Sequence, residues 1–97
     1  MTYRLIYTAD VEKSLRLIRA YIARDNSRIA LHFIRTLRGR MKSLKTYAKR
    51  CPLAPENGRR GFEIRHLIYG NYRILFTITA RTVTVLEIRH GARQPLA

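Results

Sequence analysis

The residues with the most obvious chemical capacity are arginines and histidines near predicted strands in the second half of the chain. Arginine is always charged, and its rigid planar fork matches the oxygens of a phosphate or a carboxylate. Several of these side chains on one sheet face would bind a phosphodiester or a group of carboxylates. Glu63 and Glu87 could instead pair with them across strands and give the cluster a structural role. The candidates are Arg65, His66, Arg73, Arg89, His90 and Arg93.

Other kinds of chemistry find little support. The three histidines, His32, His66 and His90, lack the paired spacing of metal ligands. The only cysteine, Cys51, directly precedes Pro52 and has no base beside it in sequence, so a small apolar filler is the favoured interpretation. There is no glycine-rich phosphate loop. We therefore expect neither a metal nor a cofactor.

The hydrophobic pattern predicts the elements that position the basic residues. Thr8 is a good helix N-cap, and Asp10 and Glu12 follow in the first turn, where the helix dipole favours negative charge. Two amphipathic helices separated by a short break favour an antiparallel hairpin. The expected elements are a strand at 3–7, helices at 9–24 and 27–49, and strands at 62–67, 72–79 and 83–89.

This order, β-α-α-β-β-β, predicts one α+β domain over residues 1–97. The helical hairpin must cover one face of a small antiparallel sheet, because its apolar seam has nothing else to pack on. In the strand at 72–79, Tyr72 and Ile74 share one face and Arg73 lies on the other. We expect that other face to stay partly open and to carry the basic side chains.

The charge indicates an acidic partner. Twenty Lys and Arg stand against six Asp and Glu, for a formal net charge of +14, and no acidic residue occurs between Asn26 and Pro55. Nucleic acid, an acidic protein and an anionic membrane are the candidates. No apolar run approaches the roughly 20 residues of a membrane span, and residues 1–10 are not a signal peptide. A lone cysteine suits a reducing compartment, so we expect a cytoplasmic protein without a membrane partner.

Three stretches resemble the RelE/ParE superfamily of toxins from type II toxin–antitoxin modules. They are YRLIYTADVEKSLRLIRAYIA, FEIRHLIYGNYRILFTI and VTVLEIRHGARQPL. With the helical hairpin between them, they span nearly the whole chain in the element order of that superfamily. The HGAR segment after a strand and the NYRILF segment after a turn are the more specific features.

The RelE-like branch of this resemblance implies cleavage of mRNA on the ribosome. By their place in the chain, Arg65, Arg73 and Arg93 match the basic residues that hold the phosphate in that site. Glu63 stands where the pattern often has another basic residue, and no tyrosine follows Arg93 to act as the late proton donor. His90 is the possible substitute, because an imidazole titrates near neutral pH.

The ParE-like branch fits better, because its members end soon after HGAR, have long paired helices and lack a nuclease site. This branch implies a poison of DNA gyrase that blocks replication, rather than an enzyme. We assign target binding to Arg73, Arg89, His90 and Arg93. A plain basic nucleic-acid-binding protein without toxicity is a further alternative.

The resemblance also implies an acidic antitoxin encoded beside the toxin. Its disordered C-terminal part is expected to fold on the toxin, with an apolar helix against the hairpin and extended chain along the sheet. The expected docking residues are Leu15, Ile18, Ile22, Phe33, Leu37 and Met41.

Overall fold

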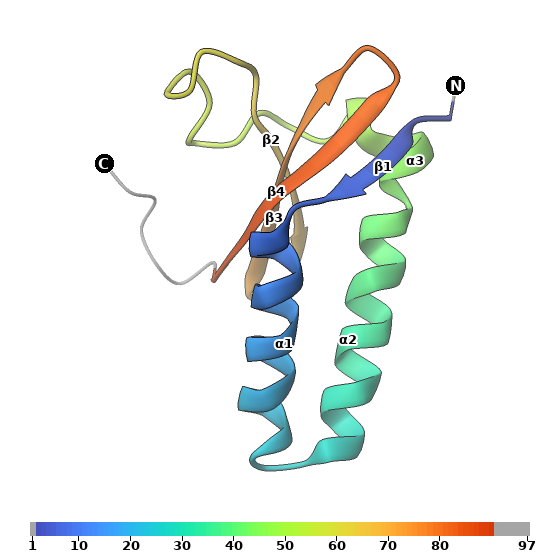
Figure 1. Cartoon of the computed structure of the whole chain (residues 1–97), viewed down its shortest axis with the longest axis vertical. Coiled ribbons are helices and arrows are strands. Elements are labelled where there is room, and N and C mark those ends of the chain that lie inside the picture. Colours follow the sequence, from blue (N-terminus) through green and yellow to red (C-terminus); the bar gives the residue numbers. More distant parts are fainter. Residues whose placement is uncertain (1, 91–97) are drawn as a thin grey trace.

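The computed structural model describes residues 2–90 and contains one four-stranded sheet of order β1-β4-β3-β2 (Figure 1). Its strands are β1 Arg4–Tyr7, β2 Arg65–Tyr69, β3 Tyr72–Thr79 and β4 Thr82–His90. The helices are α1 Ala9–Ala23, α2 Ser27–Lys42 and the single turn α3 Leu44–Tyr47, followed by the 3-10 turn η1 Ala48–Arg50. The predicted α+β class and the β-α-α-β-β-β order are confirmed.

The sheet is mixed rather than purely antiparallel. β2–β3 and β3–β4 are antiparallel hairpins, but β1 pairs in parallel with β4, with Leu5 opposite Val83. The reason lies in the connections. Because α2 carries the chain back along α1, β2 starts again in the direction of β1. The chain reverses after β2 and again after β3, so β4 also runs parallel to β1.

Side-chain caps set the limits of the two long helices. The Thr8 hydroxyl accepts a hydrogen bond from the Val11 amide at 3.3 Å, and Asn26 Oδ1 accepts one from the Ile29 amide at 3.0 Å. The predicted helix at 27–49 is interrupted after Lys42. There the Ser43 hydroxyl donates to a carbonyl of the preceding turn at 2.6 Å, and such local bonds compete with helix continuation.

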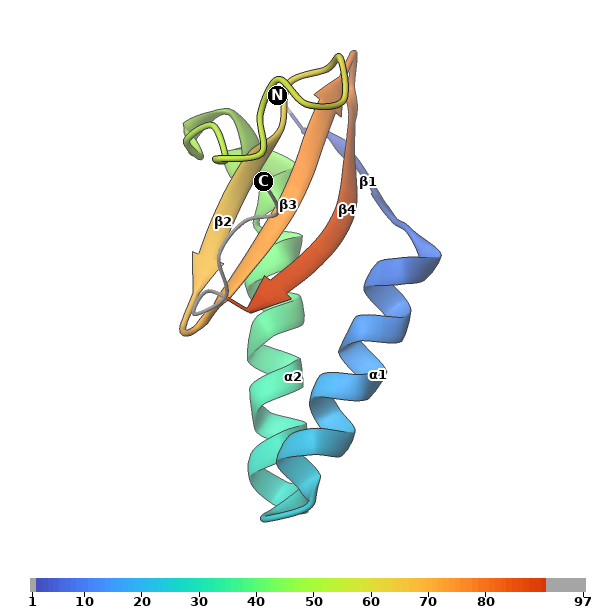
Figure 2. The same ribbon diagram turned by 90° about the vertical axis from the view of Figure 1, so that its left-hand side faces the viewer.

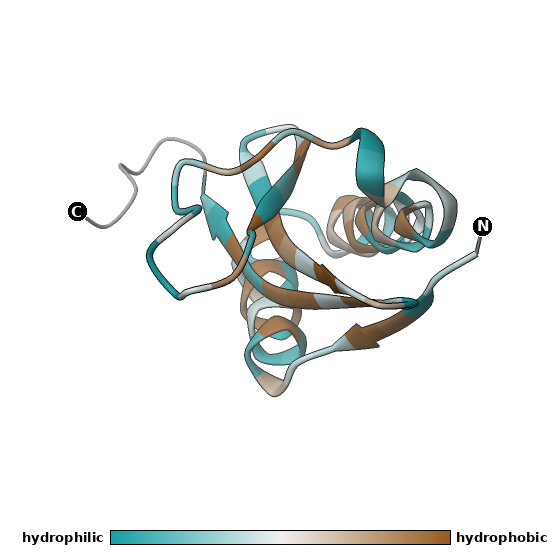
Figure 3. Ribbon diagram, turned by 90° about the horizontal axis from the view of Figure 1, so that it is seen from above, coloured by the Kyte–Doolittle hydropathy of each residue, from teal (hydrophilic) through white to brown (hydrophobic). Residues whose placement is uncertain are grey.

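The main core lies between the helical hairpin and one face of the sheet. α1 and α2 cover that face and extend beyond its lower end (Figure 2). Hydrophobic residues run along the strands and along parts of both helices (Figure 3). The fully buried residues of this core include Val11, Leu37, Met41, Leu44, Ile74, Phe76, Val83 and Val85.

The opposite face is only partly open: Arg73 is buried there, whereas its register partner Ile68 is 55% exposed. Residues 51–64, which we call the strap, pack against it and form a second, smaller hydrophobic cluster. The strap contributes Ala54 and Ile64 to this cluster, and the sheet contributes Leu75 with the partly buried Leu86. The strap also pairs with the edge of β2, where the His66 amide donates to the Pro52 carbonyl at 3.1 Å. The sheet therefore has helices on one side and irregular chain on the other.

A β-bulge in β4 determines which side chains meet the strap. Phe76 lies opposite Val85, but Leu75 lies opposite Glu87, so Leu86 is an extra residue between them. Leu86 packs in the strap cluster, and Glu87 forms an ion pair with Arg60 of the strap at 3.7 Å. The bulge thus presents both residues to the strap.

Candidate functional site

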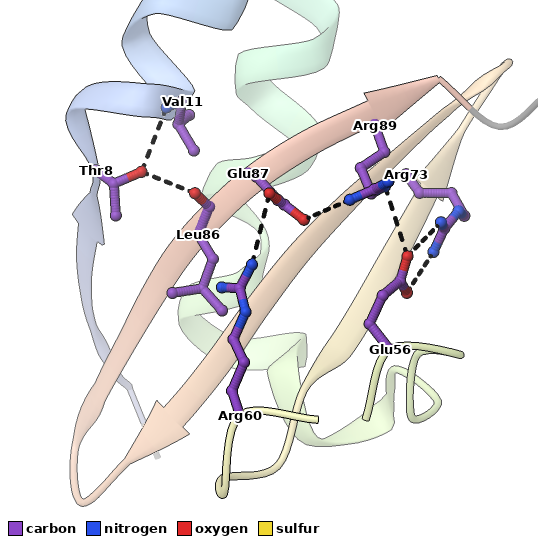
Figure 4. Close-up of polar contacts among 8 residues, drawn as sticks. All are labelled: Thr8, Val11, Glu56, Arg60, Arg73, Leu86, Glu87 and Arg89. Carbon is purple, nitrogen blue, oxygen red and sulfur yellow. Dashed lines mark hydrogen bonds and ion pairs between the residues drawn. The ribbon is translucent and has the colours of Figure 1, made fainter. Parts of the chain in front are cut away.

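The basic sheet face holds two of the predicted arginines together. Arg73 of β3 and Arg89 of β4 are register partners, and both contact the carboxylate of Glu56 in the strap (Figure 4). Arg73 donates two hydrogen bonds to Glu56, at 3.0 and 2.7 Å, and Arg89 Nε lies 3.6 Å from the same carboxylate. Arg89 also donates to Glu87 at 3.1 Å. Both arginines are therefore engaged by carboxylates of the chain itself.

This ion pair is buried. Glu56 and Arg73 are only 7% and 8% exposed. Charges survive such burial when a fork-to-fork arrangement satisfies their hydrogen-bonding groups. The hydrogen bond from Arg73 holds the pKa of Glu56 below its ordinary value, although burial acts in the opposite direction. The same bond raises the pKa of Arg73. Both groups therefore stay ionised at neutral pH.

His66 lies beside this ion pair but is not protonated, so it does not offer a general acid. Its Nδ1 lies 3.3 Å from Arg73 NH1. A guanidinium can only donate, so a hydrogen bond here requires an unprotonated Nδ1 with the proton on Nε2. Burial, and then the positive charge of Arg73, lower the pKa of His66 below its usual value. The imidazole is consequently neutral and poorly placed to donate a proton at physiological pH.

The other predicted site residues lie elsewhere. Arg65 is opposite Phe76, on the helix side of the sheet, where it donates to the Cys51 carbonyl at 2.6 Å and to Glu63 at 3.0 Å. It thereby holds the two ends of the strap. His90 pairs with Tyr72, with the two ring centroids 5.2 Å apart. The fourth predicted residue, Arg93, lies outside the described part of the chain.

The predicted nuclease set is therefore not assembled within residues 2–90, since Arg65 and His90 lie on the face opposite Arg73. The structural interpretation of the arginines fits better. Glu63 pairs with Arg65 and Glu87 with Arg89, but each pair is two residues apart along the chain and not across strands as that alternative proposed. The sequence did not predict Glu56 as the partner of Arg73, because no local pattern indicates that a loop glutamate pairs with a strand residue seventeen positions later.

A candidate binding surface lies instead between α1 and the end of the sheet. It is an open groove of about 700 Å³, which we call the apolar groove. Leu17 and Tyr21 on its α1 wall are 60% and 69% exposed, one helical turn apart. Such large exposed apolar side chains beside a hollow indicate a site for a partner. The lining residues are Ser14, Leu17, Ile18, Tyr21, Tyr72, Ile88 and His90.

The structure divides the predicted docking residues on the hairpin into two groups. Leu15, Leu37 and Met41 are at most 2% exposed and form part of the main core, so a partner cannot reach them in this fold. Ile18, Ile22 and Phe33 keep some accessible surface, and Ile18 lines the apolar groove.

Leu17 and Tyr21 were missed by the sequence-based prediction, which followed only the deepest helical seam. A second apolar stripe beside that seam, formed by Leu17, Ile18 and Tyr21, was the available signal.

Two further findings concern ligands and membranes. Within residues 2–90, no three His, Cys, Asp or Glu side chains are grouped as metal ligands would be. None of the described helices is both long enough and apolar enough to cross a bilayer.

A helical hairpin on one face of a small sheet, in the order β-α-α-β-β-β, is the architecture that the resemblance to the RelE/ParE superfamily implies. The sequence model of the family described as "ParE toxin of type II toxin-antitoxin system, parDE" matches residues 5–95. The chain therefore belongs to the ParE toxin family.

Comparison with solved structures supports the same fold. The structure titled "Chromosomal ParDE TA system from P. aeruginosa" contains a similar chain, with 17% identity and a TM-score of 0.72. The match covers 92% of the present chain and 96% of the other. Among curated proteins, none matches the chain significantly in sequence.

Proposed function

We propose that this ParE-family toxin inhibits DNA gyrase and is neutralised by an acidic antitoxin. The observation that favours gyrase over RNA is the buried pairing of Arg73 and Arg89 with Glu56. A ribonuclease of the RelE type needs arginines that are free to hold a phosphate, and it needs a proton donor. Here the carboxylate of Glu56 occupies the arginines, and the neighbouring His66 is neutral.

A supercoiling assay tests the target. Purified gyrase is given relaxed plasmid and ATP with increasing amounts of toxin, and supercoiling is read on agarose gels. We expect loss of supercoiling and accumulation of cleaved plasmid. A translating extract with the same toxin should keep its mRNA intact. Full supercoiling at a large toxin excess would reject the gyrase proposal, and cut mRNA in the extract would favour the ribonuclease.

The apolar groove is the proposed docking site for a helix of the antitoxin. Burying one exposed leucine contributes roughly 1.5–3 kcal/mol, or about 10- to 150-fold in affinity. An acidic partner is also attracted by the net charge of +14, which speeds encounter. The antitoxin would therefore combine apolar burial in the groove with acidic residues around it.

Leu17→Glu tests this docking site, with Ala20→Glu as its control. Both substitutions add one carboxylate to an exposed position of α1, but only Leu17 lines the groove. We expect Leu17→Glu to weaken binding of the antitoxin encoded beside the toxin at least tenfold, whereas Ala20→Glu leaves it nearly unchanged. Inhibition of gyrase should persist in both. Equal affinities of the two variants would contradict the proposed docking site.

A further inference from the structure

The solvent-facing side of α2 carries a line of exposed residues that is mostly basic. Residues three and four positions apart are neighbours on a helix surface, so these side chains follow one another along α2 on the side opposite its buried residues. We call this line the α2 row. It is about 21 Å long, because Arg28 and Lys42 are 14 residues apart and each residue adds 1.5 Å. Its members are Arg28, His32, Arg35, Gly39 and Lys42.

The cations of the α2 row have no partner of opposite charge in the described chain. Residues 27–55 contain no Asp or Glu at all. The one ion pair that α2 makes within residues 2–90 joins Arg38, beside the row, to Glu12 at 2.9 Å. Arg28, Arg35 and Lys42 lie within ion-pair distance of no described carboxylate. The row is therefore a strip of uncompensated positive charge.

The stability of α2 does not account for this strip. Arg28 lies in the first turn, where the helix dipole disfavours a cation, and no acidic residue occurs in that turn. Arg38 is one helical turn from both Arg35 and Lys42, and like charges at that spacing destabilise a helix. Since these charges oppose the helix that carries them, a negatively charged ligand is the better explanation for their presence.

The composition of the α2 row favours nucleic acid over other acidic partners. Protein interfaces have an apolar and often aromatic core, and a helix binds a membrane surface through an apolar face. The row contains no hydrophobic residue, and the apolar side of α2 is already buried in the main core. Interfaces with DNA, by contrast, are polar and strongly positive.

The shape of α2 fits a B-form duplex. Single strands are usually held by bases stacking on Phe, Tyr or Trp, and the row has none of these residues. A helix with its side chains is about 10–12 Å across and enters the major groove of B-form DNA, which is about 12 Å wide. The deep, narrow major groove of A-form RNA excludes side chains. The hairpin also extends beyond the sheet, so no strand flanks the Arg28 end of the row (Figure 2).

We propose that the α2 row binds the phosphate backbone of duplex DNA at the major groove. Arg28, Arg35 and Lys42 contact the phosphates, and the row spans about six base pairs at 3.4 Å each. Phosphate contacts position a protein without reading the sequence, so the binding has little sequence preference. This inference goes beyond the proposed function, because it requires neither gyrase nor antitoxin.

The probe is a fluorescein-labelled DNA duplex of mixed sequence, about three times as long as the six base pairs that the row spans. The full-length chain is titrated into it without gyrase, and binding is followed by fluorescence anisotropy. The test variant combines Arg28→Gln with Arg35→Gln. The matched control combines Arg59→Gln in the strap with Arg81→Gln in the β3–β4 turn. All four arginines are exposed, and none forms an ion pair in the described chain.

Both double variants lose two positive charges, so they differ only in where the charges were. The row variant should bind the duplex at least tenfold more weakly than the wild-type chain, and the control less than threefold more weakly. Neither should melt at a lower temperature, because no contact within the described chain is removed. Equal weakening of the two variants would mean attraction by net charge alone and would overturn the proposal.

The salt dependence of binding counts the phosphate contacts. Each contact contributes about 0.9 to the slope of log K against log salt concentration, because one neutralised phosphate releases its counterions. The row variant should therefore lower the slope by about 1.8, whereas the control should leave it nearly unchanged. An unchanged slope for the row variant would refute direct contact between the row and phosphates.

Three further probes test the choice of ligand. They are an RNA duplex of the same sequence, polyglutamate, and vesicles of phosphatidylcholine with phosphatidylglycerol. Each should bind at least tenfold more weakly than the DNA duplex. Binding of the RNA duplex as tight as that of DNA would overturn the assignment to DNA. Tighter binding of polyglutamate or of the vesicles, weakened in the row variant, would replace DNA by an acidic protein or a membrane.

These outcomes are separable from those of the proposed function. Row-dependent DNA binding by a chain that leaves gyrase active would reject the target and keep the DNA-binding site. Inhibition of gyrase by a chain without row-dependent DNA binding would do the reverse.

Discussion

Replacing Glu56 by alanine should strongly destabilise the fold, because it leaves the charge of Arg73 buried without its partner. Arg73 is 8% exposed and directs two hydrogen bonds at Glu56, at 3.0 and 2.7 Å. Arg89 loses a contact at 3.6 Å in the same substitution. Removing one member of a buried ion pair typically costs about 3–5 kcal/mol, since the other charge is neither hydrated nor neutralised.

A loss of this size is a large part of the roughly 5–15 kcal/mol that stabilises an ordinary domain. For a domain of this length, each kcal/mol lowers the melting temperature by about 4–8 °C, so a decrease of at least about 12 °C is expected. The double variant Glu56→Met, Arg73→Met removes both charges and should recover most of the loss, because an apolar pair of similar volume carries no desolvation cost.

Urea unfolding followed by circular dichroism measures both effects. The control is Glu63→Ala, which breaks the pair with Arg65 at a glutamate whose side chain is 58% exposed and should cost less than about 1 kcal/mol. A cost below about 1 kcal/mol for Glu56→Ala, or a double variant no more stable than the single one, would refute the reasoning.

Two further predictions concern the same fold. The hydrogen bond from Arg73 lowers the pKa of Glu56 in the folded chain, so unfolding in acid takes up a proton. The contribution of this pair to the free energy of unfolding is complete above the ordinary carboxyl pKa of about 4.3. It is lost as the pH falls through the lower pKa that Glu56 has in the folded chain. Urea titrations between pH 7 and 2 should show this loss in the wild-type chain and a flatter profile in Glu56→Gln; parallel profiles would contradict the assignment. Thr8→Val removes the hydroxyl that caps α1 and donates to the Leu86 carbonyl at 2.9 Å. The substitution should lower the free energy of unfolding by about 1–2 kcal/mol in the same urea assay. A negligible change would show that neither hydrogen bond contributes to stability.

The fold was largely predictable because each element carries its own local signal. Thr8 caps α1 as predicted, and the apolar seams of both helices meet the sheet. The direction of β1 was not predictable, because alternation of side chains is the same in parallel and antiparallel strands. The end of α2 was placed too late, because the apolar seam continues past Ser43 in the helical turns that follow.

The candidate site was harder to predict. The alternation in β3 correctly separated Arg73 from Ile74, but it could not show whether the face of Arg73 is open. That depends on the strap, which has no periodic pattern and contains the decisive Glu56. Arg65 was assigned to the face of Arg73, although its register with Phe76 places it opposite. Long-range pairing of irregular chain is the information that local patterns lack.

The bulge at Leu86 means that β4 reverses its odd–even parity partway along its length. Before the extra residue, Val83 and Val85 face the helices; after it, Ile88 does so, and Glu87 faces away. Regular alternation through these same residues, without the bulge, would keep one parity throughout and turn the Glu87 carboxylate toward the main core, where Val83 and Val85 lie. A single extra residue therefore keeps apolar side chains toward the helices at both ends of β4, while Leu86, Glu87 and Arg89 all face the strap.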